Sequence, residues 1–75
     1  MEDLIVIEAT IEEIIYQNKD NGYTVCTIEQ EGEEISCVGE MPGVHQGEDI
    51  KITGSWTTHP IYGKQIKVHM YERSM

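Results

Sequence analysis

Cysteines and long apolar segments are both scarce in this sequence, and each shortage excludes a class of protein. The 75 residues include two cysteines, too few for a disulfide framework and without the Cys-x-x-Cys spacing of a redox or zinc site. No run of about 18 apolar residues exists to cross a bilayer. The N-terminal segment MEDLIVIEA is acidic, whereas a secretion signal begins with a basic flank. We therefore expect a cytoplasmic protein without a membrane partner.

Positive charge is scarce as well. Five Lys and Arg face 14 Asp and Glu, for a net charge of −9, which argues against a free-standing nucleic-acid binder because such binding depends on neutralising phosphates. The imbalance is uneven: up to Asp49 the acidic residues are opposed by Lys19 alone, whereas the segment from Ile50 onward is basic. A polyanion would meet that segment first, and the acidic remainder suits solubility or a basic neighbour.

Catalytic motifs are also missing. No phosphate loop of the form GxxxxGKS or GxxxxGKT occurs, because Gly63-Lys64 is followed by Gln65 and has no glycine at the required distance upstream. No serine or cysteine lies in a recognisable nucleophile turn. The adjacent pairs Glu12-Glu13 and Glu33-Glu34 would point to opposite faces of a strand, so we interpret them as solvated charge. We predict no catalytic, cofactor-binding or metal-binding residue in this chain.

Seventy-five residues make one domain with a small core. The first segment of this domain favours a long strand. Residues 4–16 are dense in β-branched side chains, and the apolar ones alternate from Ile5 to Ile11. A helix is the alternative, because the isoleucines also follow helical spacing and Thr10 to Glu13 matches a capping box. We favour the strand, whose alternation breaks at Glu12-Glu13 as it would at a bulge that bends it around a small barrel.

Two turn signals then organise a second and a third strand. Asn21-Gly22 marks a reversal, and residues 23–30 alternate. A turn at Glu31-Gly32 would start the third strand and place Cys26 opposite Cys37. We interpret both thiols as small core residues rather than metal ligands, because no cysteine or histidine pair has metal-site spacing.

The stretch from Ile50 to Val68 combines two alternating strands, a loop marked by proline and glycine, and most of the positive charge. We expect a hairpin whose inward residues are Ile50, Ile52, Gly54 and Trp56 on one strand and Ile66, Val68 and Met70 on the other. Residues 58–64 cannot continue a central strand, because Pro60 donates no ladder hydrogen bond and Gly63 suits a turn. Trp56 is therefore expected in the core.

The chain thus consists of five short strands, with a long connection, residues 41–48, between the third and the fourth. Pro42, Gly43 and Gly47 disfavour a helix in that connection. An all-β chain with a long bent first strand suits a small five-stranded Greek-key barrel, the OB-fold, whose closure removes exposed strand edges. An SH3-like barrel is the nearest alternative. We expect residues 1–75 to form a single OB-like β-barrel domain.

Several short motifs resemble one family along nearly the whole chain. They are Ile11–Asn18, Asn21–Val25, Val38-Gly39, Pro42-Gly43, Gly47-Glu48, Gly54–Trp56 and His59–Gln65. Together they resemble the N-terminal OB domain of long-form RecD/TraA-type ATP-dependent DNA helicases, also described as exodeoxyribonuclease V alpha subunits.

The resemblance implies that this barrel is excised from the N-terminus of a longer enzyme of DNA recombination and repair. In that family the barrel precedes a helix-hairpin-helix region and a two-lobed motor that unwinds DNA with 5′ to 3′ polarity. ATP and magnesium are then expected only in the missing motor domains. The family's ATPase and strand-contacting residues carry over to no position in this sequence.

Two roles remain for the module itself. In the role we favour, the barrel is a scaffold or docking element that packs on the motor domains of its parent or recruits a protein partner. In the alternative, it binds single-stranded DNA weakly through the Ile50–Val68 hairpin, with rings for stacking and lysines near phosphates. Structural roles are also open, since Tyr62 would brace its own loop and His59 would cap a loop carbonyl. The candidate DNA or partner contacts are Lys51, Trp56, His59, Tyr62, Lys64 and Lys67.

Overall fold

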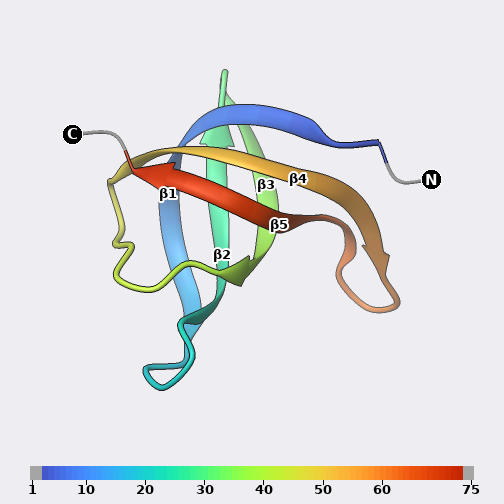
Figure 1. Cartoon of the computed structure of the whole chain (residues 1–75). Helices are drawn as coiled ribbons and strands as arrows, with labels where there is room; N and C mark the ends of the chain where they lie inside the picture. Colours follow the sequence, from blue (N-terminus) through green and yellow to red (C-terminus); the bar gives the residue numbers. More distant parts are fainter. Residues whose placement is uncertain (1–2, 74–75) are drawn as a thin grey trace.

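Five strands and their connecting loops make up the structure, a computed structural model that describes residues 3–73 (Figure 1). The strands are β1 (Ile5–Gln17), β2 (Tyr23–Gln30), β3 (Glu33–Glu40), β4 (Asp49–His59) and β5 (Gly63–Arg73). They close into a barrel in the order β1-β2-β3-β5-β4, and neighbours are antiparallel except for the parallel pair β3 and β5. This is the predicted five-stranded barrel of the OB type rather than the SH3-like alternative. Within residues 3–73, no helix has the length and apolar character to span a membrane.

Strand β1 is a single long strand that serves two sides of the barrel. Its first half, Ile5–Thr10, pairs with β4, and its second half, Thr10–Gln17, pairs with β2. The register with β2 shifts at Glu12, the extra residue of the predicted bulge. Because the bulge adds a residue, Ile11 and Ile14 both pack toward the core although they are three positions apart. This spacing is what had made a helix the alternative.

Strands β2 and β3 form the hairpin that the turn signals predicted. The register across Glu31-Gly32 is the predicted one, with Cys26 opposite Cys37. Glu31 has a φ of 50° and Gly32 a φ of 83°, the left-handed conformations that a two-residue hairpin turn requires. Both thiols are free and buried, which confirms their expected place in the core.

Isoleucine fills most of the barrel interior. The buried apolar residues are Ile7, Ala9, Ile11, Cys26, Ile28, Cys37, Met41, Val44, Ile50, Ile52 and Ile66. Met41 and Val44 come from the 41–48 loop, which contains no helix, as predicted. Fully burying a side chain of this size stabilises the fold by about 1.5–3 kcal/mol, so this loop is part of the core.

Strands β4 and β5 form the predicted hairpin, but their side chains do not alternate throughout. The register shifts between Thr53 and Gly54, where His69 is an extra residue of β5. Because of this bulge, the residues of β5 that follow it face the opposite side of the sheet from the one predicted. Met70, which we expected to face inward, is 61% exposed, whereas Tyr71 packs against the core.

The prediction that Trp56 lies in the core is wrong, because β4 extends beyond the strand that would cover it. β1 begins at Ile5, which pairs with Gly54. Beyond that point β4 continues as a hairpin with β5, which projects from the barrel in Figure 1. Trp56 is therefore 40% exposed, although its cross-strand partner Ile66 is fully buried.

Candidate functional site on the outer face of β2 and β3

The outward side chains of β2 and β3 form a surface without charge at its centre. We call it the β2–β3 face and define it by Tyr23, Val25, Thr27, Ser36 and Val38, all at least partly exposed. Val25 pairs with Val38, and Thr27 pairs with Ser36. Carboxylates lie at the two ends of this face, where Glu40 is opposite Tyr23 and Glu34 is opposite Glu29.

A groove of about 390 Å³ adjoins this face. Its lining comes from β1, β2, β3, β5 and the β4–β5 turn, and consists of Ile15, Tyr16, Val25, Cys26, Thr27, Ser36, Tyr62 and Gln65. Three large side chains of this set are exposed, Ile15 by 58%, Tyr16 by 51% and Tyr62 by 72%. Large exposed apolar side chains gathered around a hollow are typical of an interaction site.

A second bulge in β1 brings two neighbouring side chains to this groove. The register with β2 shifts between Ile14 and Tyr16, so Ile15 is an extra residue. In a regular strand Ile15 and Tyr16 would point to opposite sides, whereas here both line the groove. Asn18 Nδ2 donates a hydrogen bond to the Tyr16 hydroxyl at 3.2 Å, which ties the ring to the β1–β2 loop. Sequence reasoning missed both residues, because it detected no break in the alternation at Ile15.

The β4–β5 turn holds Tyr62 at the groove. His59 pairs with Gly63, so the turn is reduced to residues 60–62 and is tighter than predicted. His59 Nδ1 accepts hydrogen bonds from the backbone amides of Ile61 at 3.0 Å and of Tyr62 at 3.2 Å. His59 Nδ1 thus caps two backbone amides rather than a carbonyl. The ring centroids of His59 and Tyr62 are 4.8 Å apart, so Tyr62 does brace its own loop.

Two of the predicted contact residues adjoin the β2–β3 face. Tyr62 lines the groove, and Lys67 lines a neighbouring hollow of about 410 Å³ together with Tyr23 and Val38. The two hollows meet at the pair of Val25 and Val38, because each hollow is lined by one member of that pair. The face and its two hollows therefore make one continuous surface.

The other predicted lysines lie elsewhere. Lys64 covers Trp56, with its Nζ 4.5 Å from the ring centroid. Lys64 and Lys67 are three positions apart on β5 and so face opposite sides of the hairpin. Lys51 Nζ is 3.9 Å from a carboxylate oxygen of Glu72. The six predicted residues therefore do not converge on one site, and the basic character of the hairpin is divided between its two sides.

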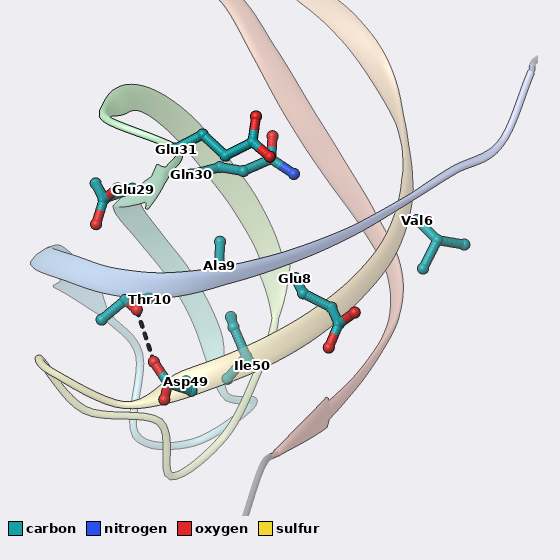
Figure 2. Close-up of a pocket in the computed structure, with 9 residues that line it drawn as sticks. All are labelled: Val6, Glu8, Ala9, Thr10, Glu29, Gln30, Glu31, Asp49 and Ile50. Atoms are coloured by element: carbon teal, nitrogen blue, oxygen red, sulfur yellow. Dashed lines mark hydrogen bonds between the residues drawn. The ribbon is translucent and has the colours of Figure 1, made fainter.

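A larger hollow of about 580 Å³ is acidic (Figure 2). Its lining residues are Val6, Glu8, Ala9, Thr10, Glu29, Gln30, Glu31, Asp49 and Ile50, with no cation among them. Thr10 Oγ1 donates a hydrogen bond to Asp49 Oδ1 at 2.6 Å, the dashed line in Figure 2. Among residues 3–73, no group of three or more His, Cys, Asp and Glu is placed to hold a metal ion. The hollow is therefore a repulsive surface for anions.

The closed five-stranded barrel and its strand order define the class of this molecule, an OB-fold domain. A family model described as the OB-fold domain of the ATP-dependent DNA helicase YrrC matches residues 4–75, and the chain belongs to this family. The resemblance to a helicase OB domain is thereby confirmed. A comparison with curated proteins found no match.

Among solved structures, the chain is similar to one chain of a replication protein A heterotrimer bound to ssDNA. The TM-score is 0.73 at 8% identity, and the match covers 96% of this chain and 57% of that one. At this identity the likeness shows the fold alone. This chain spans little more than half the length of the other.

Proposed function

We propose that this chain is a non-catalytic accessory domain of a RecD-like 5′ to 3′ DNA helicase of recombination and repair. It docks on the motor domains of that cytoplasmic helicase. Those motor domains bind ATP and magnesium. The observation that carries the docking role is the gathering of Ile15, Tyr16 and Tyr62 around an uncharged groove. Membership of a helicase OB-domain family supports the parent enzyme, and the motifs described above support its RecD-like character.

The charge distribution favours a protein partner over DNA at this groove. Lys67 adjoins the β2–β3 face, whereas Lys51 and Lys64 are engaged elsewhere. Glu34 and Glu40 lie at the ends of the face, and the net charge of −9 repels phosphates at long range. Packing the groove against another domain removes apolar surface from water, which contributes about 25 cal/mol per Å² buried.

Binding of the chain to a separately prepared motor fragment of the parent helicase tests this role. Ile15→Ser removes an apolar side chain from the groove. Val6→Ser is its matched control, because Val6 is also a β-branched residue of β1 and is 59% exposed against 58% for Ile15. We expect Ile15→Ser to weaken binding by about tenfold or more, and Val6→Ser to leave it unchanged. Equal effects of the two substitutions, or no binding of the unmodified chain, would contradict docking through this groove.

Binding of single-stranded DNA is the second candidate, and the exposed tyrosines favour it. Tyr16, Tyr23 and Tyr62 surround one continuous surface, and stacking of a base on such a ring is worth about 1–3 kcal/mol. The similar solved chain belongs to an assembly bound to ssDNA.

Fluorescence anisotropy with an oligo-dT at physiological salt separates this candidate from docking. For the isolated chain we expect no binding tighter than about 10 μM, because few lysines reach the face. Sub-micromolar binding that is lost in Tyr62→Ala and kept in Trp56→Ala would reverse our preference. Trp56→Ala is the control because this exposed ring packs under Lys64 on the other side of the hairpin.

A further inference from the structure

Cys26 and Cys37 lie directly opposite each other in the ladder between β2 and β3. Opposite residues of an antiparallel pair have Cα atoms about 4.5–5.5 Å apart. This separation falls inside the range of about 4.4–6.8 Å that a disulfide requires. Both cysteines are free. The ladder therefore brings together two thiols whose sequence spacing shows no redox motif.

The two thiols are not equivalent. Cys26 lines the groove together with Tyr62, whereas Cys37 is not among the lining residues and lies beside the buried Ile66 of β5. A hydrogen bond from the Cys37 thiol to the Cys26 sulfur lowers the pKa of Cys26. The same hydrogen bond, together with burial, raises the pKa of Cys37. Both thiols are buried, Cys26 at 1% and Cys37 at 0% exposure, but Cys26 borders the groove and is the one that deprotonates more readily.

We propose that Cys26 and Cys37 form an oxidation site that a peroxide closes to an intramolecular disulfide. The Cys26 thiolate attacks a peroxide oxygen, the O–O bond breaks, and a sulfenic acid forms as the first water leaves. Cys37 then attacks the Cys26 sulfur, so that the S–S bond forms and the S–O bond breaks with release of the second water. Hydrogen peroxide gains two electrons, the two thiols lose them, and both thiol protons end in the waters.

The test treats the folded, reduced chain with hydrogen peroxide and follows the thiol count and the intact mass. We expect the two thiols to disappear together, leaving a monomer lighter by two hydrogen atoms. The rate of thiol loss should be the same at all low urea concentrations that leave the barrel folded, because the native ladder already holds the two sulfurs opposite each other. A covalent dimer, a sulfinic acid, unreacted thiols, or a rate that rises with the unfolded fraction would overturn the proposal.

Two serine variants separate the roles of the sulfurs. In Cys37→Ser, Cys26 should stop at the sulfenic acid and be labelled by a 1,3-dione probe. In Cys26→Ser, Cys37 should remain a thiol, and the opposite order of reactivity would overturn the assignment. Because both side chains are in the core, circular dichroism is first used to check that each variant folds. The peroxide experiment on the unmodified chain does not depend on these variants.

The thermal midpoint of the oxidised chain gives a third readout. A disulfide that fits the native register constrains the unfolded chain, so the oxidised form should melt several degrees above the reduced form. Reduction of the disulfide should bring the midpoint back to its original value. A lower midpoint would show that the bond distorts the ladder, against the geometry proposed here. This inference is independent of what the groove binds.

Discussion

At the scale of single residues, Glu48 fastens the 41–48 loop to the last strand. Its carboxylate forms an ion pair with the Arg73 guanidinium and accepts a hydrogen bond from the His45 backbone amide at 3.0 Å. The hydrogen bond from Arg73 is the main cause that lowers the pKa of Glu48, and the same contact raises the pKa of Arg73. Because this loop also supplies two core side chains, a surface ion pair helps to close one end of the barrel.

The direction of this pKa shift predicts a pH dependence. A carboxyl whose pKa is lower in the folded chain contributes stability that is complete above its unfolded pKa of about 4.3. That stability is lost as the pH falls through the lower, folded pKa. We therefore expect the unmodified chain to lose more free energy of unfolding than Glu48→Gln as the pH falls below about 4.3. Urea denaturation at a series of pH values measures the difference.

Glu33→Gln serves as the control for this titration, because Glu33 is an exposed carboxylate of β3 outside the contact with Arg73. Its curve should parallel that of the unmodified chain. If the curve of Glu48→Gln also runs parallel to that of the unmodified chain, the ion pair with Arg73 contributes no stability that acid removes.

At the scale of elements, β4 packs closely against β5 at Gly54. A Cβ placed there would lie 2.3 Å from the Lys67 carbonyl oxygen and 3.1 Å from Ile66 Cγ2. A backbone oxygen in a ladder cannot move aside as a side chain can, so the two strands would have to separate. We expect Gly54→Ala to lower the free energy of unfolding by about 3 kcal/mol, measured by urea denaturation.

Gly32→Ala is the control that separates crowding from backbone conformation. Gly32 has a positive φ of 83°, but no atom lies within 4 Å of a Cβ built there. Strain at a positive φ alone costs about 1 kcal/mol. Equal losses in the two variants would show that the approach of β4 to β5 is not tight.

The hairpins could be predicted from the sequence, whereas most of the bulges could not. Asn21-Gly22 and Glu31-Gly32 are local turn signals, and the strand limits and the β2–β3 register follow from them. A bulge depends on the partner strand and needs no turn residue of its own. The bulge at Glu12 appeared as a break in alternation, but those at Ile15 and His69 did not.

The same limitation explains why the candidate site was only partly found. Tyr62 could be selected from the sequence because Pro60 and Gly63 predict a turn around it. The groove that Tyr62 lines also requires Ile15 and Tyr16, which the second β1 bulge turns to the same side. Closure of the barrel brings these distant segments together, and no local pattern in the sequence encodes that contact.

At the scale of the whole molecule, negative charge is crowded in space as well as in sequence. The acidic hollow of Figure 2 gathers four carboxylates, those of Glu8, Glu29, Glu31 and Asp49. A hydrogen bond between the carboxyls of Glu12 on β1 and Glu34 on β3 raises the pKa of Glu12, and nearby carboxylates add to the shift. Repulsion of this kind, at a net charge of −9, opposes the compact state.

We therefore expect sodium chloride to stabilise the fold. Raising it from about 20 mM to about 0.5 M shortens the screening distance from about 20 Å to about 4 Å. We expect a gain of about 1 kcal/mol, which for a domain of this size raises the thermal midpoint by about 4–8 °C. A variant with Glu8→Gln and Asp49→Asn, which removes two charges from the acidic hollow, should show a smaller rise.

Calorimetry at a single pH measures the thermal midpoint. Chloride is used because sulfate would also strengthen apolar burial, and that effect could not be separated from charge screening. A midpoint that stays constant or falls as chloride rises would mean that ion pairs such as that of Glu48 with Arg73 outweigh the repulsion. The acidic surface would then be neutral for stability. Its carboxylates would then serve solubility or a basic neighbour, the two roles that the sequence suggests.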